Sequence, residues 1–161
     1  MVGVDIQIFD WSMRKDLIKI RNIVDAMAAE LSDELRTYEF PLLREHNGRM
    51  ETDSQWITSY LGNSGTVMVA FKGSEAVGFA VIASDNEFVG TYAVPDLFVY
   101  KERRGEGIGK LLITSLEEYA RAVLKARNLV ITVHASNNGA VRLYKRKHKY
   151  REFSEKLMKR L

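Results

Sequence analysis

The segment best suited to bind a ligand holds three glycines within five residues. It spans residues 103–110 (RRGEGIGK), between a strand-like stretch and a segment of strong helical periodicity. Glycine tolerates positive φ and lets backbone amides approach a ligand closely. A helix start adds unpaired N–H groups and the positive end of the helix dipole. With the cations Arg103, Arg104 and Lys110, these features predict an anion site, most naturally for phosphate.

The spacing of these glycines excludes two familiar phosphate motifs. A Walker loop would need glycine where Arg104 stands and Ser or Thr where Leu111 stands. The dinucleotide fingerprint would need its third glycine where Lys110 stands. The remaining alternative is a turn that merely starts a helix, and such a turn rarely needs three glycines and three cations.

Composition indicates one globular domain spanning residues 1–161. The chain has 46% hydrophobic residues and no cysteine, which excludes a disulfide framework, a cysteine–zinc or iron–sulfur site and a thiol nucleophile. A chain of this length needs no metal or disulfide to stabilise its core. Because the longest apolar runs are too short to span a bilayer and the N-terminus carries no export pattern, we expect a soluble, cytoplasmic protein without membrane contact.

Charge is divided unevenly along the chain. Residues 1–100 hold 8 Lys and Arg against 15 Asp and Glu, a net charge of −7, whereas residues 101–161 hold 16 against 6, a net charge of +10. Such asymmetry within one domain suggests an anionic partner for the basic part.

The elements that must position the glycine segment alternate between strands and helices. We expect strands over residues 4–9, 66–72, 76–83, 91–100 and 129–133 and within 150–161. Helices are expected from Leu17, over 52–61 and 107–127 and near 138–147, with an irregular polar stretch over 32–50. Pro95 should bulge or unpair its strand. The unit 91–133 predicts a right-handed crossover between parallel strands, and the whole order predicts a mixed α/β fold around a central sheet.

The glycine segment also resembles a known family. Arg104-x-x-Gly107-x-Gly109 matches the Arg/Gln-x-x-Gly-x-Gly/Ala signature of the GNAT superfamily of N-acetyltransferases, and residues 95–99 (PDLFV) are similar to the strand that faces acetyl-CoA in that family. The resemblance spans roughly residues 66–150. It implies the GNAT fold, a mostly antiparallel central sheet with a splayed parallel strand pair, flanked by helices.

A second motif supports the same resemblance. Asn137-x-x-Ala140-x-x-x-Tyr144 is similar to the family's second signature and follows Gly109 by 28 residues. In this family the glycine loop holds the pyrophosphate of coenzyme A and the open strand pairs with its pantetheine. The residues thereby expected to bind acetyl-CoA are Leu97, Phe98, Val99, Arg104, Gly105, Glu106, Gly107, Ile108, Gly109, Lys110, Asn137 and Tyr144.

The family reaction is attack of a neutral amine on the acetyl thioester, which requires a base, an oxyanion donor and an acid. By resemblance, Tyr144 is the general acid that protonates the leaving thiolate. A backbone N–H near Phe98 or Val99 is the expected oxyanion donor.

The general base is left open by the sequence. Family members that acetylate protein N-termini often carry Glu or His where Thr132 stands, and threonine is not a base. His134, which shares the strand face of Thr132, and Asp96 are the candidates, Glu87 is another, and a water chain would need none of them.

The chain departs from the family after Tyr144. The family usually runs Tyr-x-x-x-Gly-Phe there, whereas residues 145–150 read KRKHKY, so the turn must differ. The short tail predicts a reduced last strand, which a second copy of the chain could complete in a homodimer.

We therefore expect an N-acetyltransferase that uses acetyl-CoA, no metal and a primary amine acceptor. Protein N-termini, lysines, polyamines and small amines all remain open as acceptors. The alternative is a non-catalytic protein of the same fold that binds acyl-CoA or nucleic acid through its basic run, although the run is better explained as a solvated surface near the cofactor.

Overall fold

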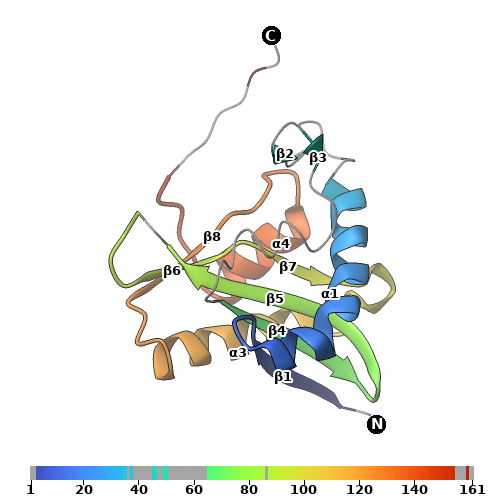
Figure 1. The fold of residues 1–161 in the computed structure, drawn as a ribbon. Helices are drawn as coiled ribbons and strands as arrows, with labels where there is room; N and C mark the ends of the chain where they lie inside the picture. Colours follow the sequence, from blue (N-terminus) through green and yellow to red (C-terminus); the bar gives the residue numbers. More distant parts are fainter. Residues whose placement is uncertain are drawn as a thin grey trace.

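A computed structural model of the chain describes residues 3–35, 37, 45–46, 49–50, 65–85, 87–154 and 159. The strands of its main sheet are β1 (Val4–Asp10), β4 (Thr66–Lys72), β5 (Glu75–Ser84), β6 (Thr91–Val94), β7 (Leu97–Val99) and β8 (Asn128–Ile131) (Figure 1). A separate pair is formed by β2 (Glu45–His46) and β3 (Arg49–Met50). The helical elements are α1 (Arg14–Leu35), a 3₁₀ turn (Lys101–Arg103), α3 (Ile108–Ala122), α4 (Asn138–Arg142) and a π-turn (Leu143–Lys147).

Strands β1, β4 and β5 form an antiparallel meander, which confirms the predicted hairpin at residues 73–75. The next strand is interrupted at Pro95, as predicted, and both of its halves pair with β5. Ala80 pairs with Leu97 and Ala83 with Ala93, so three residues of one strand stand opposite two of the other. This is a bulge, and it separates β6 from β7.

Strands β6 and β8 are parallel, in register from Thr91 opposite Asn128 to Val94 opposite Ile131. The predicted parallel strand–helix–strand unit is therefore confirmed, and the sheet is mixed. Strand β8 ends two residues before the end of the strand expected over 129–133. It is only half-buried, because it lies last in the strand order.

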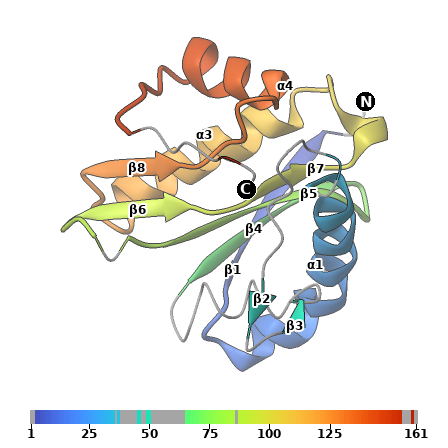
Figure 2. The same ribbon diagram turned by 90° about the horizontal axis from the view of Figure 1, so that it is seen from above.

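The sheet is covered on both faces, with α1 on one and α3 on the other (Figure 2). Alternation along β4 divides the core, because successive side chains of a strand point to opposite faces. Val67 and Val69 pack with the α1 residues, whereas Met68 and Ala70 pack with Leu112 and the rest of the buried stripe of α3. The central strands thus face apolar layers on both sides and fix the position of α3.

Two helix boundaries differ from the sequence prediction. Helix α1 continues to Leu35, so residues 32–35 are helical and not irregular. Helix α3 ends at Ala122, five residues before the predicted end. Lys125 adopts a left-handed φ of 54°, and the N–H groups of Arg127 and Asn128 turn to the Gly90 carbonyl, which starts β8.

Two further predictions fall partly or wholly outside the described residues. The helix expected over 52–61 lies outside them. Within the described part of the C-terminal segment, residues 150–154 and 159, no strand is formed, so the last strand predicted within 150–161 is absent there. Across the described ranges, no helix combines the length and hydropathy needed to cross a membrane.

Candidate functional site

The glycine loop leads directly into α3 with a backbone that only glycine adopts easily. Gly105 and Gly107 have φ of 88° and 85°, and an added Cβ at either would meet no atom within 4 Å. No side chain caps the helix, whose first internal bond runs from the Leu111 N–H to the Gly107 carbonyl. The N–H groups of the first helical residues therefore have no partner within the helix, which is the arrangement that favours an anion.

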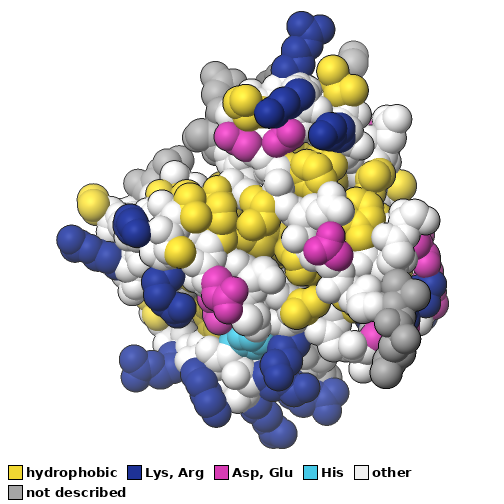
Figure 3. Space-filling view, turned by 90° about the horizontal axis from the view of Figure 1, so that it is seen from below, with side chains coloured by type: hydrophobic (Ala, Val, Ile, Leu, Met, Phe, Trp, Pro, Cys, Tyr) yellow, Lys and Arg dark blue, Asp and Glu magenta, His cyan; other side chains and the backbone are white. Residues whose placement is uncertain are grey.

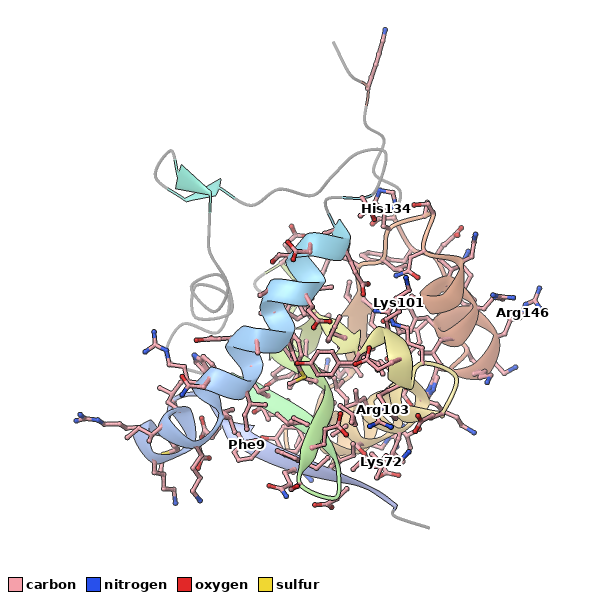
Figure 4. All side chains as sticks on the ribbon, turned by 90° about the vertical axis from the view of Figure 1, so that its right-hand side faces the viewer. Phe9, Lys72, Lys101, Arg103, His134 and Arg146 are labelled. Atoms are coloured by element: carbon pink, nitrogen blue, oxygen red, sulfur yellow. The ribbon has the colours of Figure 1, made fainter. Side chains whose placement is uncertain are left out.

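Glu106, between the two glycines, is paired with one cation from β4 and one from the 3₁₀ turn. Its carboxylate lies 2.6 Å from Lys72 Nζ and 3.8 Å from an Arg103 nitrogen, and Arg103 also lies 2.6 Å from Glu75 (Figure 4). The hydrogen bond from Lys72 is the main reason why the pKa of Glu106 is lowered. Sequence reasoning missed Lys72 and Glu75, because no local signal links a hairpin turn to a loop thirty residues further on.

The loop motif predicts that Arg104 binds the ligand, whereas in the structure its side chain contacts other residues of the protein. Its Nε donates to the Val99 carbonyl at 2.9 Å, and its Nη2 lies 2.5 Å from Glu34 at the end of α1. The guanidinium also lies over the Phe98 ring, 5.8 Å from its centroid. The charge of Arg104 is therefore balanced by Glu34. Lys110, the third predicted loop cation, is exposed at the start of α3.

Beside the loop, β7 and β8 separate. Strand β6 pairs with both β5 and β8, whereas among the described strands β7 pairs with β5 alone, and the chain after β8 turns toward α4 (Figure 2). The divergence begins at the Pro95 bulge, one residue beyond the last paired residue of β6.

The backbone groups of β7 divide between its two edges. The Val81 N–H donates to the Asp96 carbonyl and the Tyr100 N–H to the Val77 carbonyl. Hydrogen-bonded pairs alternate in an antiparallel ladder. The backbone N–H and C=O groups of Phe98 therefore also point to β5, whereas the N–H groups of Leu97 and Val99 point to the open side. Of the two oxyanion donors expected from the sequence, Val99 faces the open side and Phe98 does not.

Tyr144 lies in the π-turn and is 7% exposed. Burial, assisted by the nearby Asp96 carboxylate, raises the pKa of Tyr144 to about 12. Asp96 is itself buried, in the bulge between β6 and β7. The structure thus brings together Tyr144 and one of the candidate bases, Asp96, where the strands separate.

Asn137 and His134 both lie in the connection from β8 to α4. The Asn137 carboxamide oxygen accepts from the Ala140 N–H at 3.1 Å and caps α4, so this oxygen has a structural role. His134 Nδ1 lies 2.6 Å from the Ser136 hydroxyl, and Figure 4 shows His134 far from Lys72 and Arg103 of the glycine-loop network. Glu87 is exposed in the turn before β6, at the end of that strand remote from Pro95.

In the part of the chain that the structure describes, no group of three or more His, Asp or Glu side chains is placed to hold a metal ion. The described site offers an anion cradle, an open strand edge and a buried phenol.

Comparison with known families identifies this arrangement. The sequence model of the acetyltransferase (GNAT) family matches residues 26–150. The chain belongs to the GNAT family. That match covers the glycine loop, the diverging strands and Tyr144, and the mixed sheet with its flanking helices is the GNAT fold predicted from the sequence. No curated protein sequence matches the chain.

Solved structures share the GNAT fold at low sequence identity. A protein of Pyrococcus furiosus assigned to the acetyl transferases is 22% identical, with a TM-score of 0.70, over 98% of this chain and 100% of that one. A ribosomal-protein-alanine N-acetyltransferase of Brucella melitensis is 18% identical, with a TM-score of 0.69, over 98% and 99%. An aminoglycoside acetyltransferase from a soil metagenome is 18% identical, with a TM-score of 0.63, over 98% and 94%. These likenesses concern the fold.

Proposed function

We propose that the protein is an N-acetyltransferase that moves the acetyl group of acetyl-CoA to a primary amine. The observation that carries the proposal is that a candidate anion site and an open strand edge lie side by side. The positive-φ glycine loop opens onto uncapped N–H groups of α3, and beside it the edge of β7 is open next to the diverging β8. The first fits a pyrophosphate, and the second fits an extended amide chain such as pantetheine.

In the proposed reaction a bond forms between the amine nitrogen and the acetyl carbon, and the carbon–sulfur bond breaks. The Val99 N–H, on the open side of β7, would stabilise the negative charge on the carbonyl oxygen. Tyr144 would give its proton to the leaving thiolate. Since a thiol has a pKa of about 8.5 and Tyr144 one of about 12, this transfer is uphill and needs the tyrosine to be close to the sulfur.

The amine must lose a proton, and Asp96 is the better placed of the candidate bases. It lies in the bulge and its charge acts on Tyr144, whereas His134 is bonded to Ser136 on the α4 side. Asp96 would act directly or through water. The acceptor itself is an amine of unassigned class, since the structural neighbours named above act on acceptors as different as a ribosomal protein and aminoglycosides.

A binding protein without catalysis is the second candidate, and the exposed basic run favours it. Lys145, Arg146 and Lys147 are exposed on the π-turn, and Lys and Arg side chains gather along one edge of the face drawn in Figure 3. This candidate predicts binding to nucleic acid that weakens steeply with salt, and no turnover.

The test is release of coenzyme A in the presence of an amine panel. The panel contains peptides with free N-termini, lysine peptides with blocked N-termini, polyamines and aminoglycosides. Because the chain has no cysteine, a thiol reagent detects only released coenzyme A. Release that depends on one class of amine supports the proposal. Absence of release across the panel, together with absence of acetyl-CoA binding, contradicts it.

A further inference from the structure

The turn that carries Tyr144 ends in a buried histidine where the family pattern has glycine. The His148 N–H donates to the Leu143 carbonyl at 3.2 Å and closes the π-turn. Lys149 then adopts the left-handed φ of 62°, and the Tyr150 N–H donates back to the Tyr144 carbonyl at 3.0 Å. The chain therefore reverses one residue later than the pattern predicts, and the imidazole at position 148 enters the protein.

This imidazole is held by α3. Its side chain is 6% exposed, and Nδ1 lies 3.3 Å from Glu117 Oε1. The other ring nitrogen, Nε2, is also buried, and none of the described residues forms a hydrogen bond with it. The contact with Glu117 is thus the polar anchor of this side chain within the described part of the structure.

The contact between His148 and Glu117 connects the π-turn that bears Tyr144 with α3, the helix that forms the anion cradle. Glu117 belongs to the same helix whose first turn forms the anion cradle, and that helix also packs closely on the π-turn near its start. A Cβ at Gly109 would lie 3.4 Å from Leu143 Cδ2. The turn bearing Tyr144 is therefore attached to α3 at two points, one apolar at Gly109 and one polar at Glu117.

Tyr150 adds a third contact on the same side. Its ring meets the Tyr144 ring edge-on, with centroids 6.1 Å apart. Burial, and then the Glu117 carboxylate, raise the pKa of Tyr150 above its ordinary value. Glu117 is therefore near two side chains that follow the π-turn: His148, which ends the turn, and Tyr150, whose ring meets Tyr144.

We propose that His148, anchored by Glu117, is a positioning residue that sets where the Tyr144 hydroxyl stands relative to the glycine loop. The proposal rests on the proposed function, in which Tyr144 protonates the thiolate. It predicts a chain-specific dependence of turnover, and not of acetyl-CoA binding, on a residue that touches no reactant.

The experiment compares variants that remove or restore the anchor. H148A removes the imidazole, H148N keeps an N–H donor near the position of Nδ1, and H148Q moves the donor to the position of Nε2. E117A removes the partner, and E118A, which changes the exposed neighbouring acid of α3, is the matched control. The readouts are kcat with the best amine of the panel and the acetyl-CoA Kd from calorimetry.

We expect H148A and E117A to lower kcat by roughly 10- to 100-fold, as for other small displacements of a reacting group, with the acetyl-CoA Kd unchanged. H148N should recover most of the loss, H148Q less, and E118A should behave as the original chain. Equal kcat for E117A and E118A would overturn the proposal, and so would a loss in H148A that H148N and H148Q restore equally.

A spectroscopic readout separates this proposal from the proposed function. With ¹³Cζ-labelled tyrosine, the Tyr144 signal is assigned by its absence in Y144F, and its titration is followed without any turnover. Loss of the anchor in E117A should admit water and move the pKa of Tyr144 down from about 12 toward 10. If the pKa of Tyr144 is the same in E117A as in the original chain, the positioning role is overturned, even in an active enzyme. If the pKa shifts in a protein without turnover, the positioning role is supported and only the proposed reaction is contradicted.

Discussion

Tyr144 is the residue whose chemistry depends most on its surroundings. It is almost fully buried beside Asp96, and its pKa of about 12 keeps the phenol protonated at every pH where an amine acceptor would be assayed. A donor that stays protonated suits the role of acid toward a departing thiolate.

Replacing Tyr144 by Phe removes the hydroxyl and keeps the ring contact with Tyr150. We expect kcat to fall about 10²-fold or more, the usual contribution of a positioned acid, with the acetyl-CoA Kd changed less than about threefold, because the backbone contacts of the glycine loop remain. Steady-state kinetics with calorimetry on the same preparations measures both. A Phe variant with unchanged kcat would remove Tyr144 from the mechanism.

The raised pKa of Tyr144 also makes folding stability depend on pH. Between pH 10 and 12 the unfolded tyrosine releases its proton while the folded one keeps it, so the unfolded state binds fewer protons and stability falls as pH rises. The slope for one such group is at most about 1.4 kcal/mol per pH unit. Urea unfolding of the original chain and Y144F should show the shallower slope in the variant. Parallel slopes would mean that Tyr144 titrates normally.

At the scale of the elements, strand β7 is the critical piece, because one edge is fixed to β5 and the other is open. The fixed edge is held from both sides of the sheet, with Phe98 buried in the α1 layer and Val99 in the α3 layer. Gly78 of β5 lies beside this edge, paired with Val99. The absence of a side chain there allows the two strands to approach.

Substituting Gly78 by Ala tests this close approach. The new Cβ would lie 2.6 Å from the Phe98 carbonyl oxygen, so β7 must move outward. We expect a loss of about 2 kcal/mol or more in the free energy of unfolding, together with weaker acetyl-CoA binding, since the displaced strand carries the open edge. Gly3→Ala, where a Cβ meets no atom within 4 Å, is the control. Urea denaturation that cannot distinguish the two variants would contradict this packing.

The contact of Arg104 with Glu34 joins two elements, α1 and the glycine loop, across the molecule. Both side chains are partly exposed, at 44% and 34%, so solvent weakens the ion pair. A double-mutant cycle of R104M and E34Q on the free energy of unfolding should give a coupling below about 1 kcal/mol. A much larger coupling would show that the pair is a principal support of the fold.

Much of this arrangement is readable from the sequence because local chemistry determines it. Gly105 and Gly107 mark positive φ, Pro95 marks the bulge, and the apolar stripe of α3 marks a core helix. The partners of the loop are not readable, since the bonds of Arg104 to Glu34 and of Lys72 to Glu106 join residues that only the tertiary fold brings together. The helix end at Ala122 was missed for a similar reason, because Gly90 of a distant turn takes the N–H groups that follow.

At the scale of the whole molecule, the structure shows where the acidic and basic parts of the chain meet. Acidic residues from the first part of the chain, Glu34 and Glu75, balance the loop arginines 104 and 103, so the junction of the acidic and basic parts lies at the glycine loop. The exposed cations of the basic part include Lys110 and those of α4 and the π-turn. An anion docking on the loop would meet N–H groups of α3 first and these lysines and arginines around them.

The most direct test of the account is a calorimetric titration of acetyl-CoA into the original chain and into Gly107→Glu. The glutamate would place bulk and negative charge where the pyrophosphate is expected. Its Cβ would meet no protein atom within 4 Å, although the positive φ of Gly107 strains any other residue at this position. We predict one-to-one binding to the original chain with a Kd in the micromolar range typical of enzyme substrates, and no measurable binding to a variant whose circular dichroism is unchanged. Absence of binding to the original chain, or equal binding to both proteins, would contradict the assignment of this loop as the site for acetyl-CoA.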